Sequence, residues 1–231
     1  MSHSSSLIPH PSAPLALLGG TFDPPHVGHL FLAECARHQF NADRVLFLPA
    51  GDPYKKSGSV LSAECRVLGT QHSALSTPSP AADRLAMTAL AISDNPAFTL
   101  DDRETRRSGP TYTVDTLEEL HAEGHTNLLL ILGQDAVNDL PTWKNPERIL
   151  ELATIAVALK PWQPPEQSKI QNPKSEIIEM PPVAISSTLI RQRVSAGEPI
   201  RYLVPAAVEA YIREHHLYRD GSPSPAGTGA L

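Results

Sequence analysis

Short apolar runs alternate along this chain with stretches in which apolar residues recur at helical spacing. Such alternation is typical of βαβ units, in which a crossover helix joins two parallel strands. The runs predict strands at residues 15–18, 45–48, 98–100, 128–132 and 154–159. We therefore expect an α/β fold, with a parallel sheet and helices on both faces. In open parallel sheets ligands bind where the strands end, so the segments that follow the strands are the candidate sites.

Two of the expected helices carry apolar stripes that predict core-facing sides. One helix follows Asp83, and the other follows Thr113, which we expect to cap it. The stripes are formed by Leu85, Ala89 and Ile92 in the first helix and by Val114, Leu117 and Leu120 in the second.

A helical segment is expected near the C-terminus. Ser186 or Ser187 can cap a helix that extends to about Val194. Pro205 suits the first turn of another helix, which should end near His215.

Length and composition set the domain organisation. With 231 residues, of which 41% are hydrophobic, the chain can bury one full core, and we expect a single domain over residues 15–219. Residues 1–14 and 220–231 are rich in small and turn-forming residues, so we expect disordered tails, because burial cannot offset their ordering entropy. Residues 57–82 have a similar composition and predict a long surface loop.

Charge and cysteine content bear on partners and location. A net charge of -6 argues against a nucleic-acid binder, which normally carries a basic surface. Cys35 and Cys65 have neither metal nor disulfide spacing, which favours a reducing compartment. The longest strongly apolar run, residues 128–132, is too short to span a bilayer. We expect a cytoplasmic protein without nucleic-acid or membrane partners. The sequence does not define the oligomeric state, and a homo-oligomer is compatible with it.

The segment GGTFDPPHVGH, residues 19–29, follows the first expected strand. Gly19 and Gly20 permit a sharp turn and a close approach of bare backbone to a ligand. His26 and His29 lie three residues apart at a helix start, so their rings share one face beside the positive end of the helix dipole. This arrangement favours the binding of a phosphate chain.

Gly28 lies between the two histidines and lets a nucleotide approach the helix backbone without meeting a side chain. Two other interpretations remain open at this segment. The histidines could be part of a zinc site, although no third ligand has a plausible spacing, and the glycine pair could form an ordinary tight turn.

A second group of polar residues follows much later, in the segment ISSTLIR at residues 185–191. Hydroxyl groups open a helix there, and Arg191 follows one turn later. Free backbone N–H groups, hydroxyls and a guanidinium are what binding of a departing pyrophosphate requires. The segment is also compatible with an ordinary capped helix that carries a surface arginine.

Together the two segments resemble the HxGH nucleotidyltransferase superfamily, whose members carry GTFDPxHxGH after the first strand and ISSTxIR before a late helix. Within it the chain resembles the bacterial nicotinate-nucleotide adenylyltransferases from residue 15 to residue 218. The matching positions are Glu104, Arg107, Gly109 and Thr111 to Thr113, then Asp115 to Leu117, Gly133 to Asp135, Trp143, and the closing segment from Leu203 to Tyr218. The resemblance implies a Rossmann-like sheet and AMP transfer from ATP to nicotinate mononucleotide.

The resemblance also implies roles for individual residues. Those implied for catalysis are His26, His29, Lys56 and Arg191. Those implied for ATP binding are Gly19, Gly20, Thr21, Phe22, Gly28, Gly133, Asp135, Ile185, Ser187 and Thr188. Those implied for nicotinate mononucleotide are Thr111, Tyr112, Thr113 and Trp143. Two of these have ordinary alternatives: Trp143 could cover the sheet edge, and Asp135 could cap a helix.

The chain departs from the family pattern at two positions. Lys55 stands before Lys56 where the family has histidine, and Lys160 replaces an arginine, so charge is kept without the bidentate fork. Mg²⁺ is expected to accompany ATP, held mostly by phosphates and water, so we expect no metal site made of protein ligands. The rival functions are adenylyl transfer to phosphopantetheine and nucleotide sensing without turnover.

Overall fold

The computed structural model describes residues 13–51, 78–159 and 175–219. Residues 1–12 of the first expected tail and the whole second tail lie outside these residues, as do Lys55, Lys56, Lys160 and most of the expected loop at 57–82. The end of that loop was wrongly placed, because a helix already begins at Ala81.

Six parallel strands form one sheet. They are β1 (Leu15–Gly20), β2 (Arg44–Pro49), β3 (Phe98–Leu100), β4 (Leu128–Gly133), β5 (Ala153–Ala158) and β6 (Ser175–Ile177). Their order, β3-β2-β1-β4-β5-β6, is that of the Rossmann fold, as expected. The five predicted strands are confirmed to within two residues at each end. β6 was missed because its three residues, Ser-Glu-Ile, contain no apolar run.

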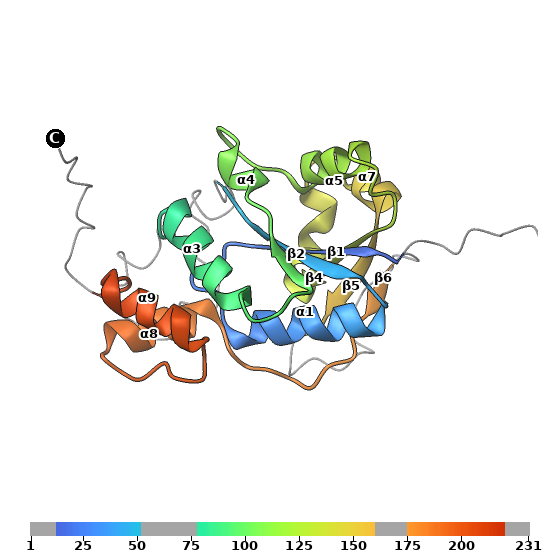
Figure 1. Cartoon of the computed structure of the whole chain (residues 1–231). Helices are drawn as coiled ribbons and strands as arrows, with labels where there is room; N and C mark the ends of the chain where they lie inside the picture. The colour runs from blue at the N-terminus through green and yellow to red at the C-terminus, as the bar shows by residue number, and fades with distance from the viewer. Residues whose placement is uncertain (1–12, 52–77, 160–174, 220–231) are drawn as a thin grey trace, which may run out of the picture.

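Helices cover both faces of the sheet (Figure 1). The described helices are α1 (Val27–Gln39), α3 (Ala81–Ile92), α4 (Arg103–Arg106), α5 (Thr113–Ala122), α6 (Gln134–Asp139), the 3-10 helix η2 (Leu140–Thr142), α7 (Pro146–Leu152), α8 (Ser187–Ser195) and α9 (Ala206–Glu214). α1, α3, α8 and α9 share one apolar core with the sheet, whereas α5 and α7 share the other. Alternate strand residues serve the two cores: Ala16 and Leu18 face the first, and Leu15 and Leu17 face the second.

The predicted apolar stripe of α3 is only partly confirmed, since Ile92 is buried but Leu85 is half-buried. Ala89 is exposed, and the buried face instead includes Arg84, Met87 and Ala91. The error arises because the hydrophobic pattern gives no reason to bury an arginine, yet Arg84 makes its hydrogen bonds inside the protein.

The stripe of α5 is confirmed, since Val114, Leu117 and Leu120 are all buried. The cap residue of that helix is Tyr112, and Thr113 is already its first helical residue. The C-terminal helical segment is also confirmed: Ser186 caps α8 by accepting a hydrogen bond from the Leu189 N–H at 3.1 Å, and Pro205 precedes α9.

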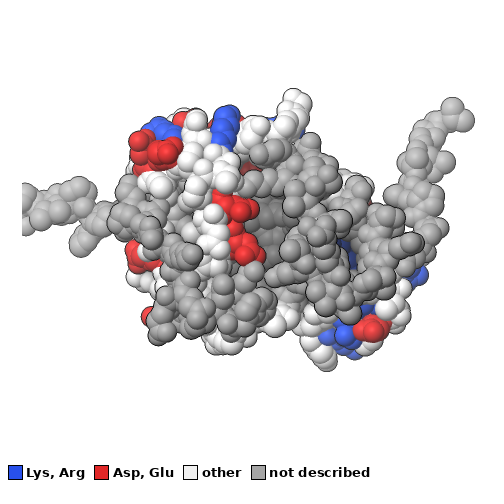
Figure 2. Space-filling model, turned by 180° about the vertical axis from the view of Figure 1, so that it is seen from behind, with Lys and Arg blue, Asp and Glu red and all other residues white. Residues whose placement is uncertain are grey.

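The sheet order places the site. β1 lies between β2 and β4. The strands β2 and β3 are added on one side of β1, and β4, β5 and β6 are added on the other side, so the strand order reverses between β1 and β4. The segments that follow β1 and β4 are therefore neighbours at this switch point. On the face seen from behind, the described Lys and Arg side chains stand in small groups near Asp and Glu (Figure 2). Among the described helices, none is long and apolar enough to cross a membrane.

Candidate active site

The segment after β1 bends later than expected. Gly19 and Gly20 are the last residues of β1 and do not form the turn. The left-handed residue is Phe22, with φ of 50°. Its ring is buried in the core, where its centroid lies 5.1 Å from that of His29, so the Phe22 side chain supports this histidine from below and does not face solvent.

The two histidines form one stacked unit at the start of α1. His26 is the cap residue, and its ring centroid lies 3.7 Å from that of His29. The His26 backbone N–H donates to Nδ1 of His29 at 3.2 Å, so the proton of the neutral His29 ring is on Nε2. His26 is only 6% exposed, and its Nδ1 has no hydrogen-bond partner among the described residues.

Gly28 makes room for the His26 ring. A Cβ atom at this position would lie 3.0 Å from Nδ1 and 3.1 Å from Cε1 of His26. The His26 ring is therefore a reason for glycine at this position, in addition to the nucleotide access that the sequence predicts.

Burial lowers the pKa of His26 from 6.5 to about 4, because the charged ring would lose its hydration. The folded protein thus holds His26 neutral at physiological pH. A neutral imidazole can orient or donate to a phosphate without carrying a charge of its own.

This shift predicts a pH dependence of stability. Between pH 6.5 and 4 the unfolded chain binds a proton on His26 that the folded chain does not, so the free energy of unfolding falls by up to about 3 kcal/mol as the pH is lowered. Well above pH 6.5 His26 is neutral in both states, so the free energy of unfolding has its full value there. Urea unfolding at pH 7 and pH 4.5 should show a larger loss in the wild type than in His26→Gln. Equal losses in the two proteins would contradict the assigned cause.

The late segment contacts the histidine segment directly. The Ser187 hydroxyl donates to the Pro24 carbonyl at 2.8 Å, and the Arg191 guanidinium donates to the Asp23 carbonyl at 2.7 Å. Arg191 also lies 3.4 Å from the Thr188 hydroxyl. Residues 163 and 168 positions apart in sequence are thus joined, as the pairing of the two motifs predicts.

A cleft of about 430 Å³ opens beside the histidines. His26, His29 and Gly28 form one end of it, and Ile185 from the segment before α8 lies on its wall. The rest of the wall is largely apolar. Leu32 contributes from α1, Ala158 and Leu159 from the end of β5 and the residue after it, and Ile178, Met180 and Val183 from the chain after β6. Apolar walls with a few convergent polar groups suit a nucleotide base and sugar. Thr21, Ser187, Thr188 and Arg191 are not among its lining residues.

Gly133 and Asp135 are at the carboxyl end of β4, as expected. Gly133 is the last strand residue and also the cap residue of α6, so the alternative that Asp135 caps this helix is wrong. Both residues are exposed, and neither lines the cleft of about 430 Å³.

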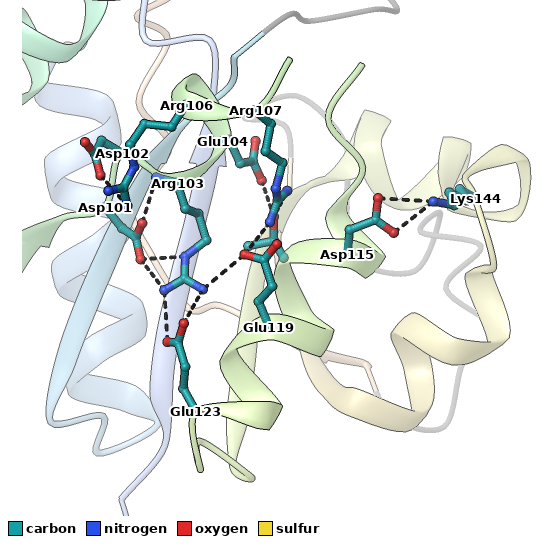
Figure 3. Close-up of polar contacts among 11 residues, drawn as sticks. Asp101, Asp102, Arg103, Glu104, Arg106, Arg107, Asp115, Glu119, Glu123 and Lys144 are labelled. Carbon is teal, nitrogen blue, oxygen red and sulfur yellow. Dashed lines mark hydrogen bonds and ion pairs between the residues drawn. The ribbon is translucent and has the colours of Figure 1, made fainter. Parts of the chain in front are cut away.

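The residues expected to bind the acceptor gather around the start of α5. Tyr112 and Trp143 both pack on the core beneath α5 and α7. Lys144 lies 4.6 Å from the Tyr112 ring centroid and 2.9 Å from an Asp115 carboxylate oxygen, which ties the chain after η2 to α5 (Figure 3).

Buried polar contacts fix the segment that precedes Tyr112. The Thr116 hydroxyl donates to the Glu104 carboxylate at 2.8 Å and accepts from Arg107 at 2.8 Å (Figure 3). Burial raises the pKa of Glu104. Arg103 joins α4 to α5 through Glu123 at 3.1 Å. A Cβ atom on Gly51 would collide with the Glu104 carbonyl, so the segment after β2 packs directly on α4.

Three residues near the site were not singled out from the sequence. Asp23 is 4% exposed, and its carboxylate accepts from the Tyr218 hydroxyl at 2.6 Å and the Ser79 N–H at 3.1 Å. Arg84 lies beneath the same segment. Asp23 and Tyr218 belong to motifs that resemble the family, which was a usable signal, but no local signal marks Arg84.

Within the ranges that the structure describes, no three or more His, Cys, Asp or Glu side chains are grouped so that they could hold a metal ion. The zinc interpretation of His26 and His29 therefore finds no third ligand among these residues.

A protein-family model, related proteins and solved structures each match most of this chain. The cytidylyltransferase-like family model matches residues 17–79 and 69–193. A relative from Roseiflexus sp. (strain RS-1), named "Probable nicotinate-nucleotide adenylyltransferase", is 46% identical over 90% of this chain and 99% of its own length. A relative of the same name from Thermomicrobium roseum is 40% identical over 89% of this chain and 91% of its own length.

Solved structures show the same fold. The Plasmodium falciparum nicotinic acid mononucleotide adenylyltransferase complexed with APC superposes with a TM-score of 0.69 at 17% identity, covering 89% of this chain and 97% of that one. The same enzyme complexed with NaAD gives a TM-score of 0.67 at 18% identity.

Proposed function

Because the chain belongs to the nicotinate-nucleotide adenylyltransferase family, we propose that it transfers AMP from ATP to nicotinate mononucleotide in NAD biosynthesis. The products are nicotinate adenine dinucleotide and pyrophosphate. One observation within the chain supports this most strongly: the Arg191 guanidinium and the Ser187 hydroxyl contact the backbone immediately before His26. These two hydrogen bonds bring together, from distant parts of the chain, the groups that we assign to the triphosphate.

The reaction needs no general base. The acceptor phosphate is anionic at neutral pH, so one of its oxygens can attack the α-phosphorus of ATP while the bond to pyrophosphate breaks in line. The protein aligns the two substrates and stabilises the charge that develops on pyrophosphate. A neutral, buried His26 fits this chemistry, because orientation and hydrogen bonding are required of it and proton abstraction is not.

We assign the adenine base to the cleft beside His26 and His29, whose apolar wall suits a purine. The phosphates would then extend towards Thr21 and the start of α8, where Ser187, Thr188 and Arg191 take the β and γ phosphates. Gly133 and Asp135, at the end of β4, would approach the ribose. Lys56 remains a proposed phosphate contact and lies outside the described residues. We propose that the nucleotide binds as MgATP, with Mg²⁺ held by the phosphates and water. We also propose that the reaction takes place in the cytoplasm.

The acceptor is assigned to the start of α5. Trp143 would stack on the pyridine ring, and backbone N–H groups near Thr111, Tyr112 and Thr113 would meet its carboxylate. The packing of Tyr112 and Trp143 on one core supports this assignment.

Trp143→Ala should raise the KM for nicotinate mononucleotide by about ten- to a hundredfold, because stacking of a base on an aromatic ring contributes about 1–3 kcal/mol. The KM for ATP should stay close to the wild-type value. Steady-state kinetics with each substrate varied in turn measure both. If the two KM values rise together, or neither rises, Trp143 does not hold the pyridine ring.

The function itself is tested by measuring pyrophosphate release from MgATP with nicotinate mononucleotide, nicotinamide mononucleotide and phosphopantetheine in parallel. We expect rapid release with the first acceptor alone. Release with phosphopantetheine would support the rival transferase. Binding of ATP without release with any acceptor would indicate a nucleotide sensor.

A further inference from the structure

Arg84 is a buried cation with no role in the reaction described above. It lies in the first half of α3 and is only 2% exposed. No ion pair joins it to a carboxylate in the part of the chain that the structure describes. Burying a guanidinium is costly unless its N–H groups make hydrogen bonds. The partners of Arg84 therefore indicate its role.

The partners of Arg84 are four backbone carbonyl oxygens. Nη1 donates to Thr21 at 3.0 Å and to Ala50 at 2.7 Å, Nη2 donates to Gly51 at 2.9 Å, and Nε donates to Ser79 at 3.0 Å. Thr21 follows β1, Ala50 and Gly51 follow β2, and Ser79 precedes α3. One side chain thus joins the three segments that enclose the carboxyl end of β1.

These contacts fix the direction of peptide groups. In a trans peptide the N–H points opposite to the C=O. Because the carbonyls of Thr21 and Ala50 point at the guanidinium, the N–H groups of Phe22 and Gly51 point away from it. The guanidinium also keeps these electronegative oxygens directed into the protein.

The same segments contact the phosphate-binding groups. The Ser79 N–H donates to the Asp23 carboxylate, and the Asp23 carbonyl accepts from Arg191. A shift of the Ser79 or Thr21 backbone would therefore be transmitted to Arg191 and to the cap residue of α1, His26.

We propose that Arg84 is a positioning residue for the adenylyl transfer, which orients the backbone of the segments after β1 and β2 towards the triphosphate. The inference rests on the proposed function. Lysine cannot replace it, because one ammonium on a flexible stem lacks the planar fork that reaches four carbonyls in three segments.

The test compares Arg84→Lys and Arg84→Met with Ile92→Ala, a core substitution at the far end of the same helix. All three should unfold at lower temperature. With folded protein at 15 °C, both Arg84 variants should lose on the order of 100-fold in kcat/KM for ATP, since small displacements of positioning groups cost this much. Their KM for nicotinate mononucleotide and every kinetic constant of Ile92→Ala should stay near wild type.

Three outcomes would overturn the proposal. One is wild-type kcat/KM for ATP in Arg84→Lys, which would mean that any buried cation suffices. Another is an equal kinetic loss in Ile92→Ala. The third is failure of both Arg84 variants to fold at 15 °C, which would make Arg84 a requirement of the fold.

Calorimetric titration with MgATP separates this inference from the function. A wild-type protein that binds MgATP but releases no pyrophosphate would refute the proposed function. Weaker MgATP binding by Arg84→Lys than by that wild type would still support the positioning role, and equal binding would refute it.

Discussion

His26→Ala is expected to lower turnover at least about a hundredfold while the protein remains folded, which is the size of effect typical of removing one group that stabilises developing charge. The ring is buried, stacked on His29, and its Nδ1 has no partner among the described residues. A buried polar atom of this kind is costly to keep, which favours a ligand as its partner.

The matched control is His38→Ala, which removes an exposed histidine from the last turn of the same helix. It should leave kcat unchanged. The activity of the wild type should also show no step between pH 6.5 and 8 that is lost in His26→Gln, because His26 is neutral throughout that range. Near-normal turnover in folded His26→Ala would remove His26 from the site.

Arg191→Ala is expected to lower kcat by about a hundred- to a thousandfold, because we propose that the guanidinium stabilises charge on the departing pyrophosphate. The Arg191 guanidinium is held in place by a hydrogen bond to the Asp23 carbonyl at 2.7 Å. Arg191→Lys should recover only part of the loss, since it keeps the charge and loses the planar fork. In the reverse direction the KM for pyrophosphate should rise in both variants.

Arg193→Ala is the matched control, because Arg193 lies on the same helix but is paired with Glu198 and the Pro199 carbonyl. It should behave as wild type. If Arg191→Ala raised only the KM for nicotinate mononucleotide, Arg191 would belong to the acceptor site and the proposed path of the phosphates would be wrong.

The sheet was predictable because its strands are encoded locally. Strands such as β4 are buried on both faces, so they appear as continuous apolar runs. β6 was not predictable, because Ser175 and Glu176 pair with β5 through backbone groups that any sequence offers. The prediction of which face of α3 is buried failed for a different reason. That face contains a cation, Arg84, whose partners are backbone oxygens.

The candidate site was partly predictable. Both motifs were identified from residue types and spacing, and their contact was expected. That Gly19 and Gly20 continue β1, and that the bend falls at Phe22, could not be predicted, because the parallel pairing with β2 extends the strand to Gly20.

The sequence alone determined the α/β class, five strands, the two motifs that we propose bind phosphate, and the family they resemble, because each depends on residues close together in the chain. Tertiary structure alone decided which side of α3 is buried, how Asp23 is held by Tyr218, and which backbone groups Arg84 contacts. Most of these hydrogen bonds join residues that are 33 to 195 positions apart, and their geometry exists only after the strands have paired.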